Sequence, residues 1–156
     1  MSKLFDIAHS FLVNDEWNPT VDESETGSTR FLRTAFSGTS GRWRCLMVIN
    51  EEREQVCMYS ILDVNCPGDQ RGAVSEFITR ANYGLIIGNF ELDYSDGEIR
   101  YKSSVDVEGG ELTDLMVKNL CYANVLTVDR YFPGLMAVMY GGKDPEGAVH
   151  EVENPN

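Results

Sequence analysis

Residues 88–105 read GNFELDYSDGEIRYKSSV, and apolar and polar side chains alternate along both halves of this stretch. Such alternation in two short runs joined by an Asp-Gly pair is typical of a β-hairpin with a two-residue turn. A turn at Asp96-Gly97 fixes the register. The predicted cross-strand pairs are Leu92 with Tyr101, Tyr94 with Ile99, Glu91 with Lys102 and Asp93 with Arg100. Each pair stabilises a hairpin by about 0.2–1 kcal/mol, but none of these residues indicates a reaction.

The composition limits the class of protein. With 156 residues, 42% of them hydrophobic, the chain can form one core, so we expect a single domain over residues 1–142 and a polar, loose C-terminal tail over residues 143–156. The net charge of −12 disfavours nucleic acid and anionic membranes as partners. No run approaches the roughly 18 apolar residues of a membrane span, and the N-terminus has no targeting pattern. We therefore expect a cytoplasmic protein.

Periodicity along the chain predicts an α+β domain. The expected helices cover residues 2–13, with Ser2 as N-cap, residues 70–83, and a stretch that begins near residue 111. The expected strands cover residues 31–36, 42–49, 55–62 and the two arms of the hairpin. The predicted order is α-β-β-β-α-β-β-α-α, with helices on one face of a mostly antiparallel sheet of about five strands.

Two stretches are less regular. Residues 14–30 are acidic and rich in turn formers, so we expect an exposed loop in which Trp17 docks on the core. Pro133 and Gly141-Gly142 bracket an apolar segment. This pattern predicts either a short separate helix over residues 133–140 or a kinked end of the preceding helix.

Motifs that carry chemistry are few. Cys45, Cys57, Cys66 and Cys121 form no Cys-x-x-Cys pair, and the two histidines lie near opposite ends of the chain, so we expect no metal site and no cofactor. There is no Gly-x-Ser-x-Gly elbow, and we expect no catalytic residues. Asn82 is expected to cap a helix or bond to nearby backbone, and Asp129 to be solvated rather than paired with the sheet.

The strands over residues 42–49 and 55–62 are apolar on both faces. Helices can cover only one face, so the other should meet residues 14–30, a second copy of the chain or a bound peptide. The segment 132–140 is apolar all round and adds a second surface of this kind. We therefore expect a homodimer. The candidate partner or dimer surface comprises Leu46, Val48, Tyr59, Ile61, Phe132, Met136 and Met139.

Several residues, in this order over residues 1–140, resemble the YbjN family of bacterial sensory-transduction regulators. They are Trp17, Pro67, Arg80-Ala81-Asn82, residues 88–92, Asp96-Gly97, Asp129 and Pro133. Residues 130–136 are most similar to cyanobacterial members. The resemblance implies a fold like that of the small type III secretion chaperones and a habit of binding protein partners. It carries no catalytic residues over to this chain.

The leading expectation is a non-catalytic protein-interaction module, either a peptide-binding chaperone or a regulatory adaptor. A small-ligand sensor domain is the alternative, and an enzyme of unknown chemistry is the third possibility. A sensor or an enzyme needs a concave pocket with converging polar groups. A peptide binder needs an exposed apolar groove or a sheet edge.

Overall fold

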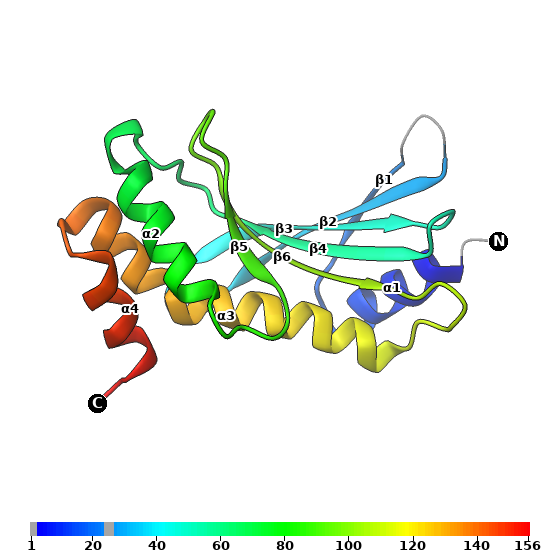
Figure 1. Cartoon of the computed structure of the whole chain (residues 1–156). Helices are drawn as coiled ribbons and strands as arrows, with labels where there is room; N and C mark the ends of the chain where they lie inside the picture. The colour runs from blue at the N-terminus through cyan, green and yellow to red at the C-terminus, as the bar shows by residue number, and fades with distance from the viewer. Residues whose placement is uncertain (1–2, 24–26) are drawn as a thin grey trace.

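The computed structural model describes residues 3–23 and 27–156 (Figure 1). In these residues, helices pack on one six-stranded sheet whose strand order is β1-β2-β3-β4-β6-β5, with every neighbouring pair antiparallel. The helices are α1 Lys3–Asn14, α2 Arg71–Asn82, α3 Asp114–Gly141 and α4 Pro145–Glu153, with a 3₁₀ turn η1 at Gly68–Gln70. The strands are β1 Thr20–Glu23, β2 Thr29–Ser37, β3 Arg42–Asn50, β4 Gln55–Ile61, β5 Asn89–Leu92 and β6 Ile99–Asp106. The predicted α+β class is confirmed, while the N-cap expected at Ser2 lies outside the described residues.

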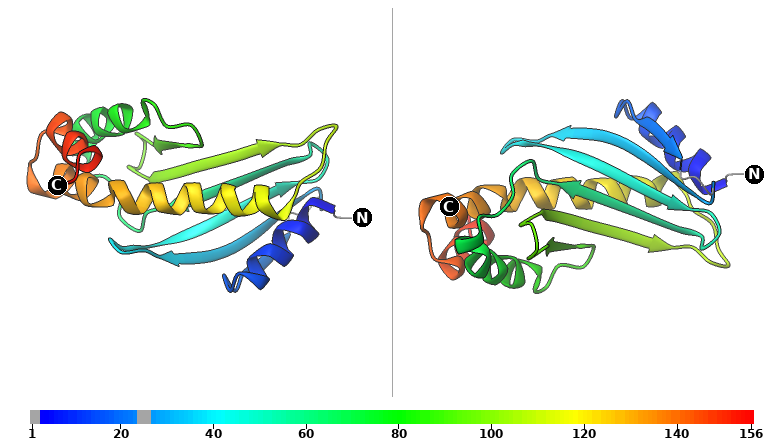
Figure 2. Two further views of the ribbon diagram at one scale, coloured as in Figure 1. Left: turned by 90° about the horizontal axis from the view of Figure 1, so that it is seen from below. Right: turned by 90° about the horizontal axis from the view of Figure 1, so that it is seen from above.

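The core lies between the sheet and two of the helices. Helices α1 and α3 run along one face of the sheet, and α2 and α4 pack together at one end of α3 (Figures 1 and 2). Along β3, alternate side chains face this core, and they are almost completely buried: Trp43, Cys45, Met47 and Ile49. Helices therefore cover one face of the sheet, as the alternation predicts.

A buried polar cluster joins α3 to the centre of the sheet. Asn124 on α3 is fully buried, and its Nδ2 donates to the carbonyl of Met58 at 2.9 Å and to Ser103 Oγ at 3.0 Å. Its Oδ1 accepts from Ser60 Oγ at 2.5 Å, and Ser60 in turn accepts from Trp43 Nε1 at 3.1 Å. Buried polar groups need such partners, so this cluster fixes the position of α3 on β4 and β6.

Residues 14–30 are not a simple exposed loop. Thr20–Glu23 form the edge strand β1, which pairs with residues 30–33 of β2. Trp17 is 9% exposed and stacks on Phe36 at 5.7 Å between ring centroids, so it docks on the core as expected. The acidic composition hid a strand that is held mainly by backbone pairing with its neighbour.

The β5–β6 hairpin differs from the predicted register by two residues. Leu92 pairs with Ile99 and Glu91 with Arg100, so the turn spans residues 93–98 rather than Asp96-Gly97 alone. The turn is long because the carboxylates of Asp93 and Asp96 accept backbone N–H bonds from residues two positions further on. A shift of two residues keeps the side chains of the paired strands on their predicted faces, since side chains alternate with a period of two. The predicted pairs of Tyr94 with Ile99 and Asp93 with Arg100 are wrong, because Asp93 and Tyr94 lie in the turn.

The C-terminal part is more helical than predicted. Pro133 lies inside the continuous helix α3, which ends where Gly142 adopts a left-handed φ of 66°. The expected loose tail contains α4, whose N-cap Asp144 accepts from the backbone N–H of Gly147. Ala148 and Val149 of α4 are buried against α2 and α3. The polar sequence of this segment therefore belongs to a docked helix rather than to a loose tail.

Two polar side chains connect elements that are distant in the sequence. Asn82 accepts from the backbone N–H of Phe90 at 2.7 Å and donates to the Phe90 carbonyl at 3.1 Å, as expected for a residue that bonds to nearby backbone. The expectation that Asp129 is solvated is wrong, because its carboxylate accepts the backbone N–H groups of Thr39 and Ser40 in the β2–β3 turn. No helix in the described part of the chain is long and apolar enough to span a membrane.

Candidate functional site

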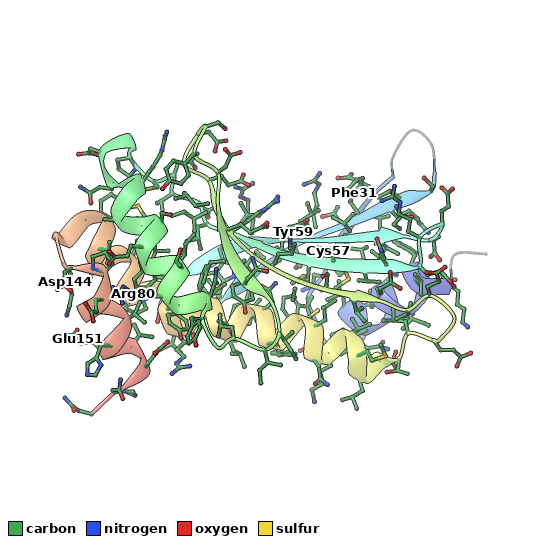
Figure 3. All side chains as sticks on the ribbon, in the orientation of Figure 1. Phe31, Cys57, Tyr59, Arg80, Asp144 and Glu151 are labelled. Atoms are coloured by element: carbon green, nitrogen blue, oxygen red, sulfur yellow. The ribbon has the colours of Figure 1, made fainter. Side chains whose placement is uncertain are left out.

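The sheet face opposite α3 carries an apolar patch. Its side chains are half-buried and alternate with fully buried core residues along β2, β3 and β4. We define the outer-face patch as Phe31, Leu46, Val48, Cys57, Tyr59 and Ile61. No described helix lies over this face in the view from above (Figure 2), and Figure 3 shows Phe31, Cys57 and Tyr59 on the side of the sheet away from α3.

The sheet register brings these side chains together. Val48 lies between Phe31 and Cys57 in one cross-strand row, and Leu46 lies directly opposite Tyr59 in the next row. Directly paired side chains in a sheet have Cβ atoms about 4.5–5.5 Å apart and are in contact. The patch is therefore continuous across the middle of the sheet, although its residues come from three strands.

Basic residues flank the patch on both sides. Arg33 on β2 and Lys102 on β6 lie on either side of the Leu46–Tyr59 pair in their row. In the next row, Arg44 on β3 and Arg100 on β6 lie on either side of Ile61. The row nearest the β3–β4 turn carries no basic side chain; it consists of Thr29, Asn50, Gln55 and Asp106.

The basic side chains that flank the patch form ion pairs with carboxylates at the rim of the outer sheet face. Glu91 accepts from Arg100 at 2.9 Å and from Lys102 at 3.2 Å, and Arg44 donates to Asp63 at 2.9 Å. These side chains are 30–63% exposed. Exposed ion pairs contribute about 0–1 kcal/mol, so each cation could exchange its carboxylate for another at little cost.

Two titratable groups lie within the patch. Burial raises the pKa of the Cys57 thiol, which keeps it protonated and apolar in character. The hydrogen bond with Cys57 is the main factor that raises the pKa of Tyr59 to about 12, followed by partial burial. The Arg100 guanidinium lies 4.4 Å from the centroid of the Tyr59 ring. Neither group is activated for proton transfer or nucleophilic attack near neutral pH.

The structure divides the predicted partner surface into two places. Leu46, Val48, Tyr59 and Ile61 lie together in the outer-face patch, whereas the three residues of α3 lie on the other side of the sheet. Phe132 is half-buried and stacks on Trp43 at 6.0 Å between ring centroids. Met136 is also half-buried against the core, and Met139 is only 3% exposed. Met139 therefore belongs to the core rather than to a partner surface.

Two patch residues were absent from the predicted surface. Phe31 alternates with the buried Leu32 along β2, and this alternation becomes informative only when the pairing of β2 with β3 is known. Cys57 alternates with Met58 in the same way, and its side is the one predicted for Tyr59. The alternation was therefore a usable signal for Cys57, whereas Phe31 required the register.

Other hollows lie on the surface of the described residues. A groove of about 600 Å³ lies along the edge of β2 and is lined by Trp17, Arg33, Phe36 and Arg42, among others. Within residues 3–23 and 27–156, no three His, Cys, Asp or Glu side chains gather as a metal ion would require. All four cysteines are free, and Cys45 lies opposite Ser60 in the pairing of β3 with β4.

The fold belongs to the type III secretion chaperone-like α+β class. A chain of the crystal structure of the ExsC–ExsE complex superposes with a TM-score of 0.52 over 83% of this chain and 92% of that chain, at 15% sequence identity. At this identity the likeness shows the fold alone. The chain belongs to the YbjN family, described as "Putative bacterial sensory transduction regulator", whose sequence profile matches residues 9–136. No curated protein matches the sequence.

Proposed function

We propose that the protein is a non-catalytic adaptor or chaperone that holds a segment of a partner protein against the outer-face patch. The observation that carries the proposal is the open face of β2, β3 and β4, where six apolar side chains form one continuous surface. A contiguous apolar surface rimmed by polar residues is typical of protein-binding sites. The regulator description of the family and the presence of a protein complex in the structural neighbour support this proposal.

A small-ligand sensor is the alternative function. The groove along β2 offers volume for a ligand, and Asp15 and Arg42 line it with opposite charges. Asp15 Oδ2 already accepts from Tyr122 and from Trp17, however, so part of this carboxylate is committed to bonds within the protein. The groove is also an open hollow, whereas small-ligand sites enclose most of their ligand, and we therefore place protein binding first and an enzyme last.

A homodimer in the cytoplasm remains part of the proposal, and the helical side offers a surface for it. Large apolar side chains are exposed in the loop between α2 and β5, with Tyr83 at 91% and Ile86 at 96%. Ile87 of that loop and the 54% exposed Leu126 line one shallow groove beside α3. A second copy seated there would leave the outer-face patch free for a partner. Sedimentation tests this part, because a dimer has twice the monomer mass of 17.5 kDa.

The test of the binding surface is photo-crosslinking in the cell from which the chain comes. Tyr59 is replaced with benzoylphenylalanine, and in a matched control Tyr140 is replaced in the same way. Tyr140 is 61% exposed and lies at the end of α3, away from the patch. We expect a discrete protein adduct with the label at position 59 and none of that mass with the label at position 140. Identical adducts at both positions, or none at position 59, would overturn the proposal.

A further inference from the structure

The outer face of the sheet differs in charge from the rest of the chain. The strand residues that point outward include five basic and three acidic side chains, a net charge of +2, in a chain whose net charge is −12. The basic ones are Arg33, Arg42, Arg44, Arg100 and Lys102, and the acidic ones are Asp22, Glu91 and Asp106. Asp63, which follows β4 and pairs with Arg44 at the rim, reduces this excess to +1. The molecule therefore presents an apolar face with a small positive excess on an otherwise acidic body, and this contrast favours an acidic partner.

The spacing of the basic flanks matches the width of a helix. Arg33 on β2 and Lys102 on β6 are separated by three strand-to-strand steps, with Leu46 and Tyr59 between them. Three steps of about 4.8 Å span about 14 Å. An α-helix with its side chains is about 10–12 Å wide, so a helix lying over the patch brings both of its flanks to basic side chains. A single extended strand is too narrow to reach both flanks.

The same charges disfavour a second copy on this face. In a two-fold symmetric contact the same surface meets itself, so basic flanks would face basic flanks. Like charges opposed across an interface are unfavourable, and the carboxylates that pair with these flanks are fewer than the cations: Asp22, Asp63 and Glu91 pair with Arg33, Arg44, Arg100 and Lys102. The occupant is therefore a different protein surface rather than the outer face of another copy. The dimer proposed above uses the helical side and is compatible with this conclusion.

We infer that the outer-face patch binds an amphipathic helix of a partner protein whose apolar stripe is flanked by Asp or Glu on both sides. This inference rests on the proposed function and specifies the partner. The apolar stripe covers Leu46, Val48 and Tyr59, and the acidic flanks replace the rim carboxylates on Arg33, Arg44 and Lys102. The inner face of the same sheet is covered by α3, so the partner helix completes a third layer.

The probes are two synthetic helical peptides of about 18 residues, or five turns. Both carry the same stripe of Leu and Ile, and the flanking positions are Glu in one peptide and Lys in the other. Fluorescence anisotropy with the full chain measures both affinities at low and at high salt. We expect the Glu peptide to bind at least about tenfold more tightly at low salt, with a smaller difference at high salt.

Substitutions in the chain test whether the peptides bind at the outer-face patch. Arg44→Glu should weaken binding of the Glu peptide and strengthen binding of the Lys peptide. Arg53→Glu makes the same charge change at an exposed residue of the β3–β4 turn and should alter neither affinity beyond about twofold. Leu46→Asp should abolish binding of both peptides, because it places a carboxylate in the apolar middle of the patch. Thermal unfolding followed by circular dichroism verifies that each variant is folded.

Each result either supports or overturns the inference. Equal affinities, tighter binding of the Lys peptide, or no binding of either peptide overturns it, as does Glu-peptide binding that survives both Arg44→Glu and Leu46→Asp. A protein crosslinked through position 59 that contains no acidic amphipathic helix also overturns it, yet leaves the proposed function standing. The two ideas can therefore fail separately.

Discussion

The Ser60 hydroxyl donates to Asn124 Oδ1 across 2.5 Å in a layer where both residues are fully buried. Ser60 is on β4, and Asn124 is on α3, 64 positions later in the sequence. The Asn124 amide also donates to the carbonyl of Tyr101 on β6 at 3.3 Å. One side chain thus joins α3 to two strands, and the outer face of these strands carries the basic-flanked patch. Asn124 therefore helps to fix the position of α3 against the strands whose outer face carries the patch.

Replacing Asn124 should be strongly destabilising. Asn124→Ala removes four buried hydrogen bonds to β4 and β6, and each buried polar group that is left without a partner costs about 1–3 kcal/mol. We expect a loss of about 3 kcal/mol or more in the free energy of unfolding, measured by urea denaturation. The matched control is Thr79→Ala, because the exposed Thr79 hydroxyl donates to the Ser75 carbonyl of its own helix, and its loss should cost under about 1 kcal/mol. Equal losses in the two variants would contradict the role assigned to Asn124.

Gly97 should tolerate no larger residue. Its φ is 83°, and a Cβ atom there would lie 2.2 Å from the Cys66 carbonyl oxygen. Gly97→Ala should therefore destabilise the chain by about 2 kcal/mol or more, since steric overlap adds to backbone strain. Gly109 also has a positive φ, of 75°, but has open space around it. Gly109→Ala should cost about 1–2 kcal/mol from strain alone. Equal costs by urea denaturation would show that contact with Cys66 is unimportant.

The Asp96-Gly97 pair illustrates how far the sequence predicts the fold. Alternation along residues 88–105 correctly predicted two paired strands and which side chains share a face. It could not predict the length of the turn, because this depends on the side-chain bonds of Asp93 and Asp96 and also on Cys66, whose N–H donates to the Gly97 carbonyl from a distant part of the chain. The glycine was assigned to a tight turn, whereas its main constraint is this tertiary contact. Strand faces follow from local pattern, but register also depends on long-range contacts.

The pH dependence of stability should change when Tyr122 is altered. The Tyr122 hydroxyl and then the Trp17 indole donate to the Asp15 carboxylate and lower its pKa below the ordinary value. The folded-state pKa is thus below the unfolded one, so the stabilisation is present above about pH 4 and disappears as the pH falls through the folded-state pKa. Tyr122→Phe removes the stronger donor. The variant should be less stable than the parent near pH 7, and the gap should narrow below about pH 4.

Urea denaturation at several pH values checks this expectation. The control is Tyr94→Phe, because the 57% exposed Tyr94 bonds through its hydroxyl to a backbone carbonyl, that of Arg71, and not to a carboxylate. Its effect on stability should be small and independent of pH. A stability gap for Tyr122→Phe that is constant from neutral to acidic pH would contradict the proposed bond to Asp15.

Helix α4 should contribute to stability despite its polar sequence. Val149 of α4 is 6% exposed and is buried where α4 packs against α2 and α3. The adjacent His150 is exposed. Val149→Asp buries a carboxylate and should cost about 2 kcal/mol or more. His150→Asp changes the surface only and should cost under about 0.5 kcal/mol. A loss below about 0.5 kcal/mol for Val149→Asp would mean that α4 is not docked in solution.

The candidate site was predictable in part, for a physical reason. Strand alternation assigns Leu46 and Tyr59 to the face opposite Trp43, and this needs only a period of two. Helix burial is harder to predict, because a helix that is apolar all round does not reveal which residues a neighbouring element covers. Met139 was assigned to a partner surface because its apolar segment does not show which residues face the core. The basic flanks also required the register, which places residues from three strands side by side.

Leu46→Ala and Met139→Ala should separate surface from core. Met139 is 3% exposed, and truncation of a buried methionine typically costs about 2–5 kcal/mol, because it removes apolar burial and leaves a cavity. Leu46 is half-buried on the open face, so its truncation removes fewer contacts and should cost about 1 kcal/mol or less in the free energy of unfolding.

The effects of the two substitutions on peptide binding should show the reverse order. Leu46→Ala should weaken the acidic peptide probe about tenfold, a loss of about 1.4 kcal/mol, whereas Met139→Ala should leave its affinity unchanged at temperatures where the variant is folded. If Met139→Ala weakened binding as much as Leu46→Ala, the partner surface would have to include the end of α3.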